Sequence, residues 1–216
     1  MKKHLTEIVF ILDRSGSMSG LEKDTIGGFN AMLRKQKREA GSAVISTVLF
    51  DHETLVLHDR VPLERVAPMT RNDYQVRGCT ALLDAVGKAI HHIGNVHKYA
   101  RPEDRPEKTL FVITTDGMEN ASRVYTYEKL KAMIRRQEEQ YGWEFLFLGA
   151  NIDAAKEAAR FGIREDRAAD YHADPRGTGA VYETLSEAIT QVRCCAAPLD
   201  ASWKRRVDAD FKSRKK

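Results

Sequence analysis

The sequence has few cysteines, few chain-breaking residues and no long apolar run, and each absence excludes a class of protein. Only three of its 216 residues are Cys, 6 are Pro and 14 are Gly, which excludes collagen-like and low-complexity chains. No stretch approaches the roughly 18 consecutive apolar residues of a membrane helix. The first apolar run ends at Asp13, too early for a secretory signal. We therefore expect a cytoplasmic protein that does not enter a membrane.

The cysteines indicate neither a disulfide framework nor a zinc site. Cys194 and Cys195 are neighbours, Cys79 stands alone, and none belongs to a CxxC pair. We expect three reduced thiols, with Cys79 a small buried side chain.

Charge is close to balanced except at the C-terminus. Seven Lys or Arg and two Asp follow Trp203, a net charge of +5, so the rest of the chain carries −1 of the overall +4. With 42% hydrophobic residues and this length, one large packed domain is expected. We assign residues 1–197 to that domain and residues 198–216 to a basic tail, a frayed and solubilising terminus. Contact of this tail with nucleic acid is the alternative.

Strand and helix patterns alternate along residues 1–197, which predicts an α/β fold with a mostly parallel sheet and helices on both faces. A hairpin around residues 51–53 makes one edge strand antiparallel. Residues 61–78, which contain two prolines, are expected to be irregular or to form short helical turns. We predict strands at 5–12, 44–50, 54–58, 110–114, 143–148 and 167–171, and helices at 21–38, 81–97, 127–141, 154–161 and 178–195.

Oxygen-bearing side chains follow two of the predicted parallel strands and precede one helix. Asp13, Ser15 and Ser17 follow the first strand, Asp116 follows the strand at 110–114, and Thr80 precedes the helix at 81–97. Ligands of open α/β sheets bind at the carboxyl ends of the strands, and the chain direction brings Thr80 to that same edge. Any one of these loops could be only a helix cap. Together their five oxygen donors suit Mg²⁺ or Mn²⁺ better than zinc or copper.

Three strings carry a specific resemblance: IVFILDRSGSMSG, RGCTALLDAVG and FVITTDGMEN. In order and spacing they resemble the von Willebrand factor type A family with its metal-ion-dependent adhesion site. The resemblance spans roughly residues 5–195. It implies a doubly wound Rossmann-like domain with one antiparallel edge strand. Cys79 stands where family members often carry a second glycine, which leaves the local backbone there in question.

The resemblance also implies a site and a partner. Asp13, Ser15 and Ser17 match the DxSxS motif, Thr80 the isolated threonine and Asp116 the final aspartate. It implies that the hydroxyls bind metal directly, that an aspartate acts through water, and that an Asp or Glu of a protein partner completes the coordination. We therefore expect a metal-dependent protein-binding module without a small-molecule substrate.

An enzyme remains an alternative, namely an Mg²⁺-dependent phosphohydrolase with Asp13 as nucleophile. Ser15 occupies the position where haloacid dehalogenase-type phosphotransferases carry a second Asp, so the acid catalyst is missing. No GxxxxGK[ST], GxGxxG or GxSxG motif occurs. His91 and His92 lie roughly 16–18 Å along a helix from Thr80. Only His52 is expected at the same edge, as an ordinary turn residue, so we predict no catalysis.

Two smaller features bear on the surroundings of the site. Asn151 or Asp153 could shape partner specificity, although capping of the helix at 154–161 is the expected role of Asp153. Gly27 and Gly28 lie inside a predicted helix, where each costs about 1 kcal/mol relative to Ala. We expect them to allow a close backbone approach near the metal loop.

Overall fold

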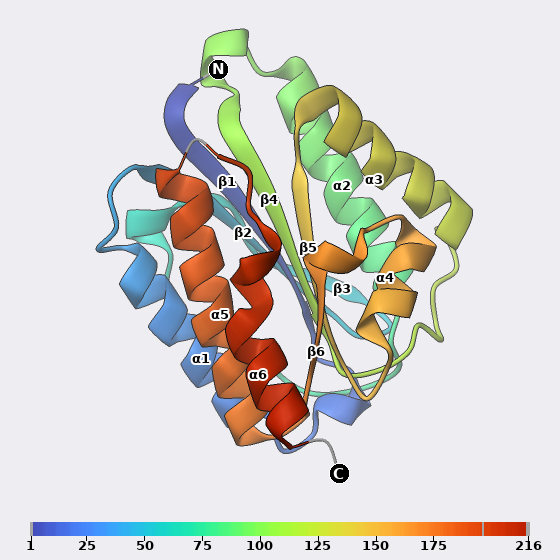
Figure 1. The fold of residues 1–216 in the computed structure, drawn as a ribbon. Coiled ribbons are helices and arrows are strands. Elements are labelled where there is room, and N and C mark those ends of the chain that lie inside the picture. The colour runs from blue at the N-terminus through green and yellow to red at the C-terminus, as the bar shows by residue number, and fades with distance from the viewer. Residues whose placement is uncertain (1, 196, 215–216) are drawn as a thin grey trace.

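A six-stranded sheet crosses the middle of the molecule in a computed structural model that describes residues 2–195 and 197–214 (Figure 1). The strand order is β3-β2-β1-β4-β5-β6, and β2 with β3 is the antiparallel pair. The central strand β1 is buried on both faces, which explains its uninterrupted apolar run. The strands are β1 (Lys2–Asp13), β2 (Ser42–Phe50), β3 (Thr54–Pro62), β4 (Pro106–Thr115), β5 (Glu144–Ala150) and β6 (Ala168–Tyr171).

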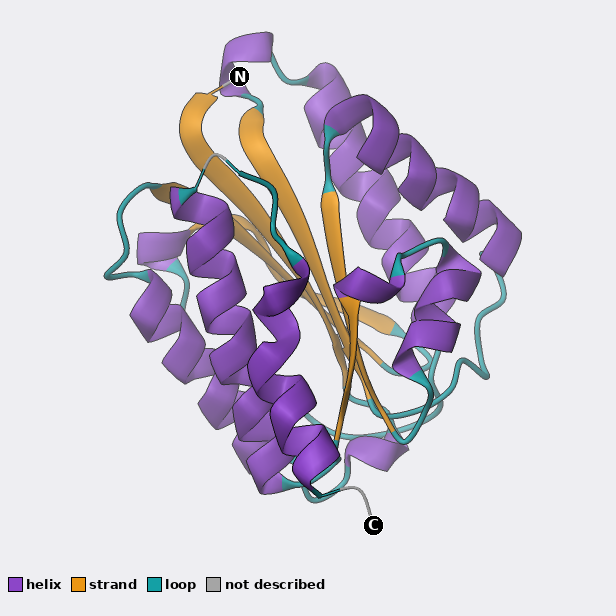
Figure 2. Ribbon diagram, in the orientation of Figure 1, coloured by secondary structure: helices purple, strands orange, loops and turns teal. Residues whose placement is uncertain are grey.

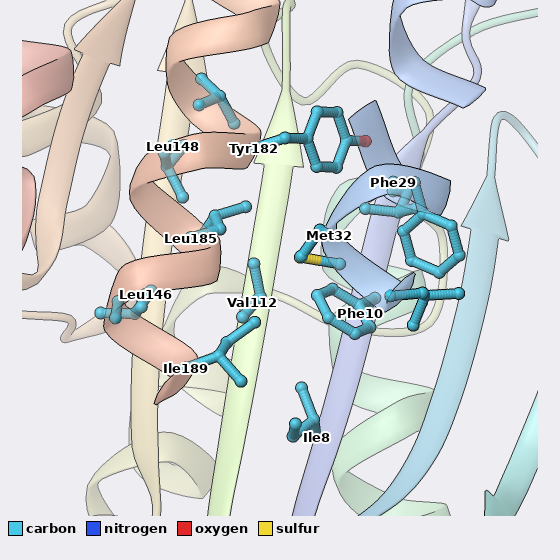
Figure 3. Close-up of a cluster of buried hydrophobic side chains, with 14 of the residues drawn as sticks. Ile8, Phe10, Phe29, Met32, Val112, Leu146, Leu148, Tyr182, Leu185 and Ile189 are labelled. Atoms are coloured by element: carbon cyan, nitrogen blue, oxygen red, sulfur yellow. The ribbon is translucent and has the colours of Figure 1, made fainter. Parts of the chain in front are cut away.

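Helices cover both faces of this sheet (Figure 2). On one face α1 and α5 pack over Phe10 and Val112, as Figure 3 shows. On the other face α2, α3 and α4 pack over Val9 and Phe111. The expected doubly wound, mostly parallel Rossmann-like sheet with one antiparallel edge strand is confirmed. The helices are α1 (Glu22–Gln36), α2 (Leu82–Tyr99), α3 (Tyr127–Tyr141), α4 (Ala154–Phe161), α5 (Pro175–Cys194) and α6 (Arg205–Ser213).

The edge strand β3 is longer than the sequence predicts. The strand expected at 54–58 continues to Pro62 through two shifts of register against β2. Arg60 adopts a positive φ of 50° in this extension. The alternation of apolar and polar residues, by which strands are predicted from sequence, does not indicate such a conformation. The rest of 61–78 is irregular or forms short turns, as expected, with one helical turn at Leu63–Arg65 and another turn at 71–73.

The C-terminal segment differs from the frayed tail that its charge predicts. Residues 201–214 contain a short turn followed by α6, which packs against α5 and β6. Leu199, Trp203 and Val207 are buried in the core, and the Trp203 indole donates a hydrogen bond of 2.8 Å to Asp166 O. These three apolar side chains are spaced four residues apart and so lie on one face. Burial of that face is enough to fix the segment on the domain, although its overall composition is basic. The domain boundary at 197 stays a prediction.

Gly28 allows a close approach, but at a different place from the one expected. A Cβ at Gly28 would lie 2.3 Å from the Tyr182 ring of α5, whereas a Cβ at Gly27 would have no atom within 4 Å. The expected approach near the metal loop is therefore wrong. Gly28 lets α1 and α5 pack closely over the sheet, and Gly27 faces open space.

No helix in the described residues is both long enough and apolar enough to cross a membrane. The cytoplasmic location stays a prediction.

The two neighbouring glycines provide a matched test of this packing. Gly27→Ala should raise the free energy of unfolding by about 0.5–1 kcal/mol, since Ala is the better helix former and its methyl group meets nothing. Gly28→Ala should lower it by about 1–3 kcal/mol because Tyr182 must move. Urea unfolding of both variants measures the difference. Equal effects of the two substitutions would contradict this account of the α1–α5 contact.

Candidate metal centre

The pairing of β1 with β4 brings the carboxylates of Asp13 and Asp116 together at the carboxyl ends of these two strands, at the lower end of the sheet in Figure 1. Leu12 lies beside Thr114, so the residues that follow, Asp13 and Thr115, also lie together. Asp13 is 1% exposed. Its Oδ1 accepts a hydrogen bond from Ser15 N at 2.7 Å, and its Oδ2 accepts one from Thr115 Oγ1 at 2.6 Å. The Asp13 carboxylate is thus fixed from both sides.

A chain of hydroxyls connects this loop with Asp116. Ser15 Oγ and Ser17 Oγ are 3.0 Å apart, and Ser17 Oγ donates to Asp116 Oδ1 at 2.5 Å. The other oxygen, Asp116 Oδ2, is buried and has no hydrogen-bond partner in the described part of the chain. A buried carboxylate oxygen without a partner is costly, so this position is one that a cation would stabilise.

Thr80 joins the group from the loop before α2. Its N–H donates to Asn120 Oδ1 at 2.9 Å, and its carbonyl accepts from Asn120 N at 3.0 Å. A Cβ at Gly117 would lie 3.6 Å from Thr80 Oγ1 and 3.3 Å from Ser17 Oγ, so both hydroxyls face the same small space. All five residues singled out in the sequence therefore lie together. Gly117 leaves that space open because it has no side chain.

Sequence reasoning missed the residues that hold the loop after β4 in place. Glu119 accepts hydrogen bonds from Leu83 N at 2.9 Å and Ser122 N at 2.7 Å, and so ties this loop to the start of α2. Asp84 accepts three backbone hydrogen bonds from residues 123–125. The one signal in the sequence is the polar pair Glu119-Asn120 at the end of the string FVITTDGMEN.

The two site carboxylates are poorly stabilised as anions. Burial raises the pKa of Asp13, although hydrogen bonds from Thr115 and Ser15 oppose the shift. Burial raises the pKa of Asp116 to about 6, the Ser17 hydrogen bond opposes this, and the negative charge of Asp13 adds to it. A divalent cation between two such carboxylates would relieve both effects. The oxygen-only donor set and the unpartnered Asp116 Oδ2 fit a hard divalent ion.

His52 lies beside the Thr80 loop, as expected from the hairpin turn. A Cβ at Gly78 would be 2.1 Å from His52 Nδ1, and Gly78 has a positive φ of 67°. Asp51, His52 and Glu53 carry potential ligand atoms within 4.8 Å of one another. The sequence interpretation did not recognise this second cluster.

Three expectations about neighbouring residues have different outcomes. Cys79 is exposed, so its expected burial is wrong; it follows Gly78, whose positive φ bends the loop just before it. Asp153 caps α4 by accepting from Lys156 N at 2.9 Å, as predicted. Asn151, with a positive φ of 57°, donates to Asp116 O at 3.4 Å and so lies at the rim of the site.

Comparisons with known proteins confirm the resemblance at the level of the fold. No family model matches the chain, and no curated protein matches it by sequence. Among solved structures, the von Willebrand factor domain of the type V pili tip protein Mfa5 from Porphyromonas gingivalis aligns with a TM-score of 0.61. It is 11% identical, over 90% of this chain and 98% of that chain.

Two metal-containing structures are also similar. The proximal thread matrix protein 1 of the mussel byssus, described with a zinc-occupied MIDAS motif, aligns with a TM-score of 0.57 and 15% identity over 86% of this chain. This chain covers only 46% of that protein's length. Manganese-loaded TRAP of Plasmodium vivax aligns with a TM-score of 0.55 and 13% identity, over 80% of this chain and 70% of that chain. The chain has the von Willebrand factor type A fold.

The raised pKa of Asp116 predicts that the effect of Asp116→Asn on stability depends on pH in chelator-treated protein. The folded state holds its proton up to about pH 6, whereas an unfolded Asp titrates near 3.8, so stability falls as the pH rises between these values. Asp116→Asn should therefore melt higher than wild type at pH 7.5 and close to wild type at pH 4. Thermal melts at both pH values measure this. A variant less stable than wild type at pH 7.5 would show that the anion is well accommodated without metal.

Proposed function

We propose that this chain is a binding module that holds one divalent metal ion through Asp13, Ser15, Ser17, Thr80 and Asp116. The observation that carries the proposal is Asp116 Oδ2, a buried carboxylate oxygen without a partner among the described residues, in a cluster of oxygen donors only. Such donors favour Mg²⁺ or Mn²⁺. Zinc and manganese occur in the similar structures named above, and this supports a divalent ion here.

The metal would act as an electrophile toward a protein partner. Asp13 and Ser15 are buried, whereas Ser17 and Cys79 are exposed, so the cluster opens on one side of the loops. Two carboxylates at most balance the charge of the ion, and a protein site of this kind leaves coordination positions to water or an outside ligand. We infer that an Asp or Glu of the partner occupies such a position. The protein's own residues hold the ion and orient its open side.

The environment of Asp13 argues against the phosphohydrolase alternative. A nucleophile must be accessible to the reacting atom of the substrate. Asp13 is 1% exposed, and each of its two oxygens accepts a hydrogen bond from Ser15 N or Thr115 Oγ1. We therefore infer a binding protein and not an enzyme.

Contact of the C-terminal segment with nucleic acid is also less favoured. Arg206 pairs with Glu183, and also with Glu187 at 3.2 Å. Arg214 pairs with Asp174 and Asp210, and Lys204 donates to Ala168 O at 2.6 Å. The carboxylates compensate the charges of Arg206 and Arg214, which weakens the attraction of this segment to phosphates.

Metal titration tests the site. Calorimetric titration of Mg²⁺ and Mn²⁺ into chelator-treated wild type should give one saturable site, and at a hundredfold excess over Kd the ion should add about 2.7 kcal/mol of stability. Asp13→Ala should bind neither ion. Asp104→Ala, which removes an exposed carboxylate paired with Arg101, is the matched control and should bind like wild type. Unchanged binding by Asp13→Ala would overturn the assignment.

Peptide selection tests the partner chemistry. Peptides selected from a random phage-displayed library on the Mg²⁺-loaded protein should share one Asp or Glu, and chelator should release them. Replacement of that residue by Asn or Gln should abolish binding, because a neutral amide is a weaker ligand for a hard cation. Selected peptides that lack a shared carboxylate, or that stay bound in chelator, would contradict metal-mediated recognition.

A further inference from the structure

Asp51 is a fully buried carboxylate that the proposed metal site does not use. It follows β2, is 0% exposed, and lies between two guanidinium groups. Its Oδ2 is 2.9 Å from Arg14 Nε and 3.0 Å from Arg77 Nε. Its Oδ1 accepts a hydrogen bond from Glu53 N at 2.7 Å. With two cations and a backbone amide already against it, this carboxylate is not available to a second metal ion despite the nearby His52 and Glu53.

The two arginines come from the two loops that carry the proposed hydroxyl ligands. Arg14 lies between Asp13 and Ser15, and Arg77 lies three residues before Thr80. The Arg14 side chain is 7% exposed, whereas that of Arg77 is half exposed. Both side chains therefore point from the ligand loops toward the end of β2.

Backbone hydrogen bonds join the same loops to each other. Arg77 N donates to Arg14 O at 2.9 Å, and Gly16 N donates to Gly78 O at 3.0 Å. Ala81 N donates to Asp51 O at 2.8 Å, which ties the Thr80 loop to β2. The Asp51 carboxylate thus stands where three loops converge, and its two ion pairs connect all of them.

The ion pairs of Asp51 also balance the charge of the two ligand loops. Two guanidinium groups on the ligand loops would repel an incoming divalent cation if nothing balanced them. Asp51 provides a buried negative charge in direct contact with both, and Glu53 adds a contact of 2.6 Å to Arg77 Nη2. These pairs hold both positive charges against carboxylates and compensate them locally.

We propose that Asp51 is a positioning residue for the metal centre. Through Arg14 and Arg77 it holds the Ser15–Ser17 loop against the Thr80 loop and cancels the positive charge that these loops carry. This inference rests on the proposed metal site, and wild-type metal binding tests that site separately.

The first test removes the charge and keeps the shape. Asp51→Asn should raise the Kd for Mg²⁺ about tenfold, the order expected when one positive charge near the ion is left uncompensated in a partly solvated site. The difference in Kd between Asp51→Asn and wild type should be smaller in 1 M salt, where the Debye length is about 3 Å and charges are strongly screened. Glu7→Gln is the matched control. It neutralises another fully buried carboxylate of the sheet, which pairs with Arg60 and His97 in the middle of β1, six residues before Asp13, and it should leave the Kd unchanged.

The second test restores the balance of charge. Arg77→Gln in the Asp51→Asn background should recover most of the lost affinity, since the loss of one positive charge then offsets the loss of one negative charge. Arg77→Gln alone should lower the Kd below that of wild type, because it removes one positive charge from the same loops while Asp51 still pairs with Arg14. Failure of the double variant to recover affinity would overturn the electrostatic role of Asp51.

The third test measures positioning without metal. In chelator, amide hydrogen exchange of Gly16, Arg77 and Ala81 should be faster in Asp51→Asn than in wild type, because these amides donate the bonds that join the loops. Exchange around Glu7, in the middle of β1, should be unchanged. Wild-type exchange at the three amides, together with a wild-type Kd, would show that Asp51 has neither role, even if wild type binds Mg²⁺ well.

Discussion

The burial of two like charges at the end of two adjacent parallel strands is the constraint on which this structure depends. Asp13 and Asp116 leave β1 and β4 side by side because those strands pair in register at the centre of the sheet. Hydrogen bonds from Ser15, Ser17 and Thr115 satisfy three of the four carboxylate oxygens and leave Asp116 Oδ2 alone. The protein thus accepts a local electrostatic cost at an edge where a cation can offset it.

Much of the fold and the candidate site could be predicted because the signals are local and strong. The buried run before Asp13 has the length and composition of a central strand, and parallel topology then determines where its end must lie. Thr80 could be placed by chain direction alone. The resemblance added the family pattern, and the five residues do converge.

The errors arose where the answer depends on a partner distant in sequence. The basic composition after Trp203 says nothing of Glu183 and Asp174, which neutralise Arg206 and Arg214 from another helix. The pair Gly27-Gly28 does not reveal that Tyr182 lies against only one of them. In the sequence Asp51 is an ordinary turn residue. Its pairing with Arg14 and Arg77, which are distant in sequence, becomes visible only in the folded structure.

The two outer strands of the sheet differ in how they are exposed to other molecules. α6 packs along β6, whereas β3 has no further strand beside it in the described residues (Figure 1). An open strand edge is a template on which a second chain can add strands. The register shifts, the positive φ of Arg60 and the final Pro62 break the regular spacing of amides along half of β3. Irregularity on one side and a helix on the other therefore both hinder edge-to-edge aggregation of the sheet.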